Sequence, residues 1–309
     1  MKICVIGAGG LIGKSLIECI AVLPNVEVTA FDRTPPPLEP PVRWIQGDLQ
    51  NPEDCIRLVD GQDVIFHLAH TNSPLTSDRD MEEDTLLNLV PTLRLLMAIE
   101  TVGRKPHLIY PSSGGAIYGV SASGNPFKET DPCLPLNSYG IQKLAAEHYI
   151  RLSARRGTLT ATMLRIGNAY GWLLPPGRLQ GLIGSAVTRV LTGQPIRIIG
   201  NPENVRDYIH IDDIIAAFLL VMKRNIGFET FNIGTGVGTP VKEIIEIIER
   251  KIHKHATKKV ENFDSANTLP NWCILDTQKA RDVINWQSKI GIEEGIHRLF
   301  EEGKRKLKD

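Results

Sequence analysis

A tyrosine and a lysine, Tyr139 and Lys143, stand four residues apart in the segment YGIQK at 139–143. If this segment is helical, the spacing places the phenol and the ammonium on one face of the helix. A phenol titrates near 10 in water, and a neighbouring ammonium favours the phenolate and lowers that pKa. Tyr139 could then accept a proton from a substrate hydroxyl as a general base. Such a pair also arises by coincidence, so its meaning depends on what accompanies it.

A glycine-rich turn, GAGGLIG at 7–13, follows the first predicted strand and opens the first predicted helix. Gly7 permits a tight turn, Gly10 lets the backbone approach a pyrophosphate, and Gly13 allows close packing of helix and strand. The free N–H groups and the dipole of the helix N-terminus favour phosphates. The turn therefore predicts a dinucleotide site, in which Tyr139 and Lys143 gain a catalytic meaning. The predicted cofactor contacts in the turn are Gly7, Gly10, Leu11, Ile12 and Gly13.

Two acidic residues after later strands refine the cofactor. Asp32 ends the second predicted strand, where a carboxylate can bind the adenosine ribose hydroxyls and repel a 2′-phosphate, which favours NAD over NADP. Arg33 is the counter-argument, since it could bind that phosphate, but Asp32 comes first after the strand. Asp48, beside Leu49 at the end of the third strand, either reaches the adenine amino group or caps the following helix.

Short apolar runs alternate with longer amphipathic stretches through the first half of the chain. This alternation predicts an α/β fold of the doubly wound (Rossmann) type, with a parallel sheet covered by helices on both faces. The predicted strands are 3–6, 27–31, 43–46, 64–68, 107–110 and 161–166, and the predicted helices are 11–22, 52–59, 81–101 and 138–156.

The pattern becomes irregular after Ile166 and predicts a smaller, interleaved C-terminal substrate domain. We expect an NAD-binding domain over 1–167 and a substrate-binding cap over 168–309, with 206–236 packing back onto the first domain. The elements predicted here are loops at 34–41 and 171–177, helices at 180–191, 211–222 and 241–251, and strands at 196–199 and 229–233.

The composition excludes several classes of protein. The 309 residues include 35 basic and 35 acidic side chains, so the formal net charge of zero predicts no nucleic-acid partner and no anionic membrane surface. Five cysteines without a CxxC spacing predict neither a metal site nor disulfides, and a reducing cytoplasm is the simplest location. No apolar run reaches the roughly 20 residues that a bilayer span requires.

Further motifs accompany the glycine turn and the Tyr139–Lys143 pair. They are GDL at 47–49, HLAH at 67–70, Asn88, SSGGAIYG at 112–119, LRIGNAYG at 164–171 and VRDYIHIDD at 205–213. With these motifs the chain resembles the extended short-chain dehydrogenase/reductase family over nearly its whole length. Within that family it is most similar to nucleotide-sugar 4-epimerases of the UDP-glucose type.

The resemblance implies roles for individual residues. Tyr139 would be the catalytic base, and Lys143 would be its partner and a ligand of the nicotinamide ribose. Arg206 would bind a substrate phosphate, although a buried ion pair with Asp207, Asp212 or Asp213 is a rival interpretation. The other implied contacts are Leu68, Ala69 and Asn88 with NAD, and Asn168 with the substrate diphosphate. A UDP-sugar is the favoured substrate, and helices at 81–101 and 138–156 could pair in a homodimer.

Three departures from the family pattern bear on chemistry. The usual Ser or Thr four residues before Tyr118 is Gly114 here, so Ser113 or Ser112 would supply the hydroxyl, unless both only satisfy backbone groups. Gly115 and Ala116 stand where related dehydratases carry an acid and a base, which disfavours dehydration.

The third departure concerns the diphosphate. The epimerases carry an arginine about ten residues before the aspartate that is Asp276 here, but Ala266 and its neighbours include none. Binding would then rely on Arg206 and on others such as Arg178. These observations favour an NAD-dependent 4-epimerase. The alternatives are a keto-sugar reductase or other alcohol dehydrogenase of the same fold, and a non-catalytic dinucleotide-binding regulator.

Overall fold

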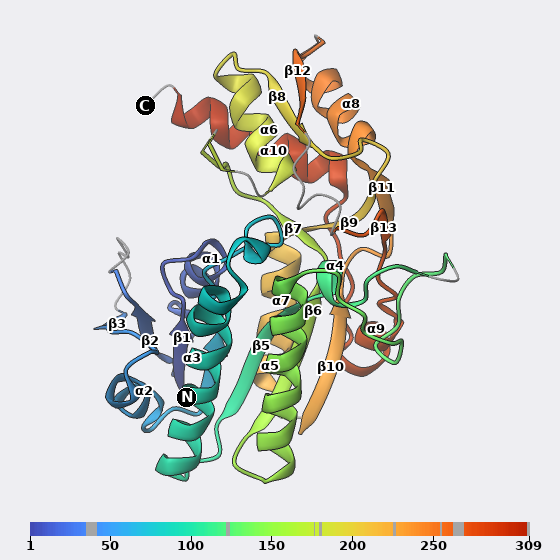
Figure 1. Ribbon diagram of the computed structural model, residues 1–309. Helices are drawn as coiled ribbons and strands as arrows, with labels where there is room; N and C mark the ends of the chain where they lie inside the picture. The colour runs from blue at the N-terminus through green and yellow to red at the C-terminus, as the bar shows by residue number, and fades with distance from the viewer. Residues whose placement is uncertain are drawn as a thin grey trace.

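A seven-stranded parallel sheet forms the larger layer of the molecule, with strand order β10-β6-β5-β4-β1-β2-β3 (Figure 1). The computed structural model describes residues 1–34, 42–121, 124–175, 177–178, 181–224, 227–253, 255–261 and 269–307. The sheet strands are β1 (Lys2–Ile6), β2 (Glu27–Asp32), β3 (Arg43–Gln46), β4 (Val64–His67), β5 (His107–Ser113), β6 (Thr160–Ile166) and β10 (Phe228–Ile233). This arrangement confirms the predicted doubly wound fold.

Helices cover both faces of this sheet, so its central strands are apolar on both sides. In β1, Ile3 and Val5 face one core cluster, while Cys4 and Ile6 face the other. The first cluster includes α1 (Leu11–Ile20) and α7 (Ile211–Lys223); the second includes α2 (Pro52–Val59), α3 (Met81–Val102) and α5 (Ser138–Arg155). The chain leaves β1 toward β2 and β3, then returns to the other side of β1 as β4. A ligand site is expected at this switch point.

A smaller layer lies beyond the carboxyl ends of the main strands (Figure 1). It contains a sheet in which β7 (Asn168–Tyr170), β11 (Gly238–Pro240) and β13 (Trp272–Cys273) all pair with β9 (Val205–His210). A second sheet pairs β8 (Ile196–Ile199) with β12 (Lys258–Glu261), and α6 (Leu182–Leu191), α8 (Val241–Ile252) and α10 (Ile292–Lys306) pack around them. The chain returns to the main sheet through α7 and β10 before it completes this layer.

The elements that the sequence analysis missed are short or interrupted by glycine. They are a 3₁₀ turn (Ser77–Arg79), α4 (Gly114–Ile117), β7, β9, β11, β12, β13, α9 (Gln278–Ile284) and α10. Strands of two to four residues carry too little alternation to be recognised. In α10, Gly295 lowers helix propensity, but a Cβ there would lie 2.1 Å from the Tyr170 hydroxyl, so packing requires the glycine. The helix predicted from 180 begins at Leu182; residue 180 and loop residues 35–41 lie outside the described part.

Helix α3 is more apolar than the sequence analysis allowed. Its 22 residues make it, by length and composition, the one helix in the described ranges that could cross a bilayer. In the structure α3 packs between α2 and α5, and its inward face buries Asp84 and Asn88. It therefore packs as one of the helices that cover the sheet, and its buried polar side chains bond the segment after β4 and the start of α5.

Candidate active site

The glycine turn between β1 and α1 leaves no room for a side chain at two of its glycines. Gly7 has a φ of +82°, and a Cβ on it would lie 2.7 Å from the backbone nitrogen of Ala69. A Cβ on Gly13 would lie 2.3 Å from the Gly7 carbonyl oxygen. The first turn of α1 carries no acidic residue, so its N–H groups face the space above the turn uncompensated. This cradle fits a pyrophosphate.

Asp32 folds back onto the turn. Its Oδ2 accepts a hydrogen bond from the Gly9 N–H at 2.8 Å, and its Oδ1 accepts one from the Arg33 N–H at 2.7 Å. The carboxylate thus fixes the glycine turn, and its remaining lone pairs are the ones that a ribose could use.

Asp48 shapes a different turn. Its Oδ1 accepts from the Gln50 N–H at 2.9 Å, and its own N–H donates to Asp54. The cap of α2 is Asn51, whose Oδ1 accepts a hydrogen bond from the Glu53 N–H. The interpretation of Asp48 as the cap of this helix was therefore wrong. The neighbouring Leu49 side chain is buried in the core beneath the sheet edge.

Asn88 holds the chain that follows β4. Its Oδ1 accepts from the backbone N–H and the hydroxyl of Thr71, at 2.8 and 2.9 Å, and its Nδ2 donates to Asp84. Leu68 lies in this segment and lines the pocket, whereas Ala69 packs under Gly7. Asn88 therefore positions the wall of the cofactor site from behind.

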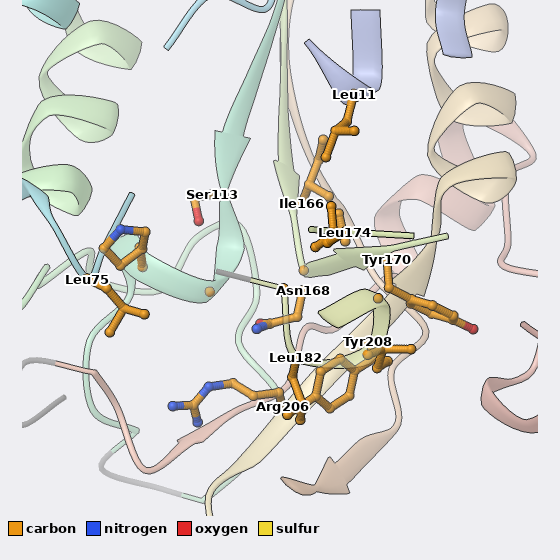
Figure 2. Close-up of a pocket in the computed structure, with 18 of the residues that line it drawn as sticks. Leu11, Leu75, Ser113, Ile166, Asn168, Tyr170, Leu174, Leu182, Arg206 and Tyr208 are labelled. Atoms are coloured by element: carbon orange, nitrogen blue, oxygen red, sulfur yellow. The ribbon is translucent and has the colours of Figure 1, made fainter. Parts of the chain in front are cut away.

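One continuous cavity of about 470 Å³ runs from the glycine turn to β9 (Figure 2). Most of the predicted site residues line it: Gly7, Gly10, Leu11, Ile12, Gly13, Leu68, Ser112, Ser113, Tyr139, Lys143, Asn168 and Arg206. The predicted residues that do not line it are Asp32, Asp48, Leu49, Ala69 and Asn88. Of the second group, Asp32, Ala69 and Asn88 support the glycine turn and the segment after β4, whereas Asp48 and Leu49 lie in the turn after β3.

Tyr139 and Lys143 lie in the first turns of α5, which is capped by the Asn137 side chain. The Lys143 ammonium donates to the Pro111 carbonyl at 3.0 Å and lies 5.8 Å from the Tyr139 ring centroid. Burial lowers the pKa of Lys143 to about 7, partly opposed by Glu147. Burial raises the pKa of Tyr139 to about 12. Burial therefore favours the protonated form of the Tyr139 phenol.

The hydroxyl beside Tyr139 is that of Ser113, at the end of β5. Its hydrogen bond to the phenol favours the phenolate and partly offsets the effect of burial on the Tyr139 pKa. A side chain at Gly114 would have to displace the buried Leu275, because a Cβ there would lie 2.6 Å from a Leu275 methyl carbon. The Ser112 hydroxyl is buried with no hydrogen-bond partner in the described ranges, so the interpretation that it only satisfies a backbone group was wrong.

Arg206 projects from β9 into the far end of the cavity, on the same side of Ser113 as Asn168 (Figure 2). Its side chain is buried, with the residue 8% exposed, and its Nη1 donates to the Val205 carbonyl at 2.9 Å. Burial lowers the pKa of the guanidinium. Among the described residues no carboxylate pairs with it. A buried cation with spare donors is suited to a phosphate ligand.

The three aspartates that could have paired with Arg206 are engaged elsewhere. Asp207 accepts from the N–H groups of Thr235 and Gly236, and from the Thr235 hydroxyl. Asp213 caps the backbone at 289–290, and Asp212 pairs with Arg298 at 3.2 Å. The ion-pair interpretation of Arg206 is therefore wrong. Arg178 lines the cavity as an exposed side chain, while Ala266 lies outside the described residues.

Sequence reasoning missed two groups around the phenol. The His70 ring packs edge-to-face on the Tyr139 ring at 4.8 Å, and His70 lines the cavity. The Asp84 carboxylate is buried on α3 and lies near the start of α5. His70 ends the HLAH motif at 67–70, but that motif does not indicate a contact with Tyr139, and Asp84 has no local sequence signal because its partners on α5 lie far along the chain.

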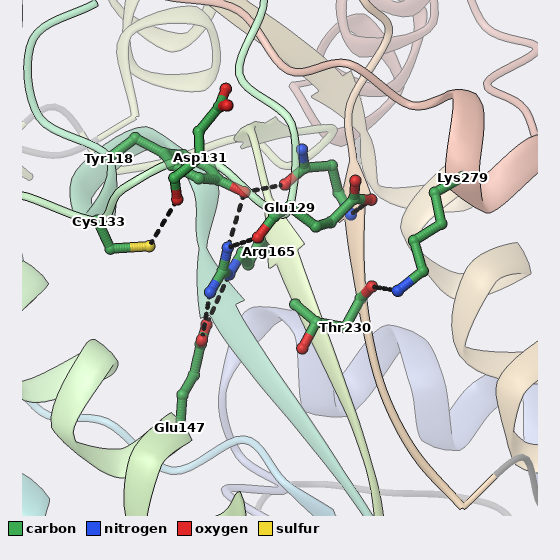
Figure 3. A network of polar contacts seen from close by, with 9 residues as sticks. Tyr118, Glu129, Asp131, Cys133, Glu147, Arg165, Thr230 and Lys279 are labelled. Carbon is green, nitrogen blue, oxygen red and sulfur yellow. Dashed lines mark hydrogen bonds and ion pairs between the residues drawn. The ribbon is translucent and has the colours of Figure 1, made fainter.

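A buried ion pair holds α5 against the sheet behind the site (Figure 3). The Arg165 guanidinium of β6 binds the Glu147 carboxylate of α5 at 2.7 Å and donates to the Tyr118 hydroxyl at 2.9 Å. The Tyr118 hydroxyl in turn donates to Asn232 on β10. These contacts fix the helix that carries Tyr139 relative to β5 and β6.

The model of the NAD dependent epimerase/dehydratase family matches residues 3–234, which include the glycine turn, Tyr139, Lys143 and Arg206. The chain belongs to this family. NAD is the cofactor of the NAD dependent epimerase/dehydratase family, and the absence of side chains at Gly7, Gly10 and Gly13, with the free N–H groups at the start of α1, fits its pyrophosphate.

Members with assigned activities fall in several reaction types. A dTDP-4-dehydro-6-deoxyglucose reductase of Escherichia coli is 30% identical over 96% of each chain. A UDP-glucose 4-epimerase of Mycolicibacterium smegmatis is 27% identical over 97% of this chain and 98% of its own. The structure of the Thermotoga maritima UDP-glucose 4-epimerase with UDP-glucose superposes with a TM-score of 0.90 at 30% identity, covering all of both chains. The resemblance to nucleotide-sugar enzymes is thereby confirmed, and the protein is an enzyme of this epimerase, dehydratase and reductase family.

Proposed function

We propose that the protein is an NAD-dependent epimerase that inverts C4 of a nucleotide-diphosphate sugar, most simply a UDP-sugar, through a 4-keto intermediate. One observation carries the proposal: the buried Arg206 guanidinium has no carboxylate partner among the residues that the structure describes, and it shares a cavity with Tyr139 and Ser113. A diphosphate held at Arg206 and Asn168 directs its sugar toward the phenol. The same cavity continues to the glycine turn, where the cofactor pyrophosphate fits.

Each residue has a defined task in this reaction. Bound NAD supplies the hydride acceptor and, in its reduced form, the hydride donor. Tyr139 takes the proton of the C4 hydroxyl during oxidation and returns it during reduction. Ser113 hydrogen-bonds the same oxygen, and the Lys143 ammonium favours the phenolate by its positive charge.

The two other reaction classes have less support in this site. Dehydration requires an additional acid and base, but α4 carries only Gly, Ala and Ile side chains. A keto-sugar reductase would use the same Tyr139, and the Escherichia coli relative favours this as the second candidate. The regulator hypothesis was motivated by the lack of a hydroxyl at Gly114; the hydrogen bond of Ser113 to Tyr139 removes that motive.

The test is proton NMR of the purified enzyme with UDP-glucose, UDP-galactose and a panel of other nucleotide sugars. We expect C4 epimers to reach equilibrium without added cofactor, and Tyr139→Phe to abolish the conversion. Stoichiometric loss of added NADH with a keto-sugar, and no epimer from any sugar, would identify the reductase instead. Tyr139→Phe that still turns over would contradict both candidates.

We also propose that the enzyme forms a homodimer through α3 and α5. Leu86 and Met97 on α3 are 50% and 66% exposed, and Ile141 and Leu152 on α5 are 53% and 43% exposed. Each pair is separated by three helical turns, so both adjacent helices present an apolar stripe. Met97→Glu should convert a dimer to a monomer in light scattering, whereas Val22→Glu, at an exposed site away from these helices, should not. A wild-type monomer would contradict the proposal.

A further inference from the structure

Asp84 is a fully buried carboxylate that accepts four hydrogen bonds. Its Oδ1 accepts from the amide nitrogens of Asn72 and Asn88, both at 2.7 Å. Its Oδ2 accepts from the Ser138 hydroxyl at 3.0 Å and from the Gln142 amide nitrogen at 2.5 Å. An ionised carboxylate offers about four acceptor positions, and all are occupied by donors. This donor set fits the charged form and leaves no position for a proton.

Neutral dipoles alone hold this charge, because no lysine, arginine or histidine pairs with Asp84 in the described ranges. Burying an anion without a cation costs folding free energy, so the presence of Asp84 indicates a role other than stability. The residues that donate to Asp84 indicate what that role is. Ser138 and Gln142 flank Tyr139 in the first turns of α5, and Asn72 belongs to the segment after β4 that lines the cavity.

The same segment also grips the α5 backbone. The Tyr139 N–H donates to the Ser77 hydroxyl at 3.1 Å, and the Ser138 N–H donates to the Asp78 carboxylate at 2.7 Å. Asp84 is the point at which this segment, α3 and α5 meet. The carboxylate therefore fixes the position of the helix start that carries the phenol.

We propose that Asp84 is a positioning residue that holds Tyr139 in place and, through its negative charge, keeps the phenol protonated until a positive charge enters the cavity. The inference rests on the proposed role of Tyr139 as the proton acceptor. A nearby negative charge disfavours a phenolate, and Asp84 acts on Tyr139 in that direction.

Among the described groups near the phenol, Asp84 is the carboxylate that disfavours the phenolate, and Asp78 accepts a hydrogen bond from the neighbouring Ser138 N–H. From β5, Tyr110 is held protonated, since burial raises its pKa well above the usual value. From the segment after β4, His70 is held neutral, since burial and Lys143 lower its pKa. On α5 itself, Lys143 is the basic group, with a pKa that burial lowers to about 7, and Glu147 acts on that lysine rather than on the phenol. Phenolate formation is thereby coupled to the positive charge of the oxidised cofactor rather than to bulk pH.

The test removes the charge and keeps the shape, with Asp84→Asn. The new amide can donate to the Ser138 hydroxyl and to Gln142, whose Oε1 is buried without a partner and can turn to accept it. Tyrosinate absorbance is recorded after rapid pH jumps without cofactor. The contribution of Tyr139 is isolated by subtracting the trace of the matching Tyr139→Phe protein in each background. We expect the Tyr139 midpoint to fall by about one pH unit in Asp84→Asn.

Asp84→Glu, which keeps the charge, is the matched control and should move the midpoint far less. Should Asp84→Asn not fold by circular dichroism, the smaller neutral Asp84→Ser replaces it. An unchanged or higher midpoint in the folded neutral variant overturns the inference. The absorbance measurement needs no substrate. A shifted Tyr139 midpoint in a protein that converts no sugar would therefore contradict only the proposed function. Normal epimerisation by the wild type together with an unshifted Tyr139 midpoint in Asp84→Asn would contradict only the proposed role of Asp84.

Discussion

The imidazole of His70 packs edge-to-face against the phenol ring of Tyr139, with centroids 4.8 Å apart and ring planes at 87°. Its Nε2 is buried without a hydrogen-bond partner in the described chain, and burial lowers its pKa well below the usual value. His70 is thus a neutral aromatic support for the reacting phenol. This relationship and three others at the site lead to measurable expectations.

His70→Ala should lower kcat about tenfold and leave KM for UDP-glucose nearly unchanged, because an aromatic pair contributes on the order of 1 kcal/mol to holding the phenol. His70→Phe keeps a ring at this position and should recover most of kcat. Steady-state kinetics of His70→Ala and His70→Phe measure kcat and KM for both variants. Equal losses in the two variants would show that a ring nitrogen, and not packing, is what Tyr139 requires.

Ser113→Ala should reduce kcat by about 10- to 100-fold, since it removes a hydrogen bond to the reacting oxygen and to the phenol. A new hydroxyl at residue 114, where the family usually carries one, should not restore the lost activity. A Cβ at Gly114 would lie 2.6 Å from Leu275, so Ser113→Ala combined with Gly114→Ser should be less stable in urea and no more active. Recovery of activity in the double variant would contradict the assignment of Ser113.

Arg206→Ala should raise KM for the nucleotide sugar by about 10- to 100-fold with a smaller change in kcat, because the guanidinium contacts the diphosphate in the ground state as well as the transition state. Arg298→Ala is the matched control, as this arginine pairs with Asp212 and Glu294 on the surface. Calorimetric titration with UDP should show the same loss of affinity. Unchanged UDP binding by Arg206→Ala would place the diphosphate elsewhere.

Lys143 should make stability depend on pH. Burial lowers its pKa to about 7 from the ordinary 10.5, so between these values the unfolded chain binds more protons than the folded one. The free energy of unfolding therefore rises with pH across this window through Lys143. Lys143→Met has no proton to bind, so its advantage in stability over the wild type should be largest near pH 7 and below.

Urea unfolding of both proteins at about pH 6, 8 and 10 measures this difference. The gap between Lys143→Met and the wild type should close as the pH approaches 10. A gap that is constant with pH would mean that Lys143 titrates as an exposed lysine does, and that its burial carries no electrostatic cost.

The sequence by itself determined the features whose physics is local. The turn over 7–13 needs glycine at Gly7 because of its positive φ, and the four-residue spacing of Tyr139 and Lys143 follows from helical geometry. The alternation of apolar runs and amphipathic stretches predicted the parallel sheet, since each strand and helix buries its own face. These inferences need no knowledge of what lies elsewhere in the chain.

The tertiary structure decided everything that depends on distant partners. Ser113 rather than residue 114 carries the hydroxyl because Leu275, far along the chain, occupies the space beside Gly114. Asp84 bonds Ser138 across 54 residues of sequence. Arg206 faces the cavity without an ion pair to any described residue, because its acidic neighbours Asp207, Asp212 and Asp213 are engaged elsewhere. The burial of a polar group, and the charges that surround a phenol, are set only when distant segments pack together. No local sequence pattern predicts which segments will meet.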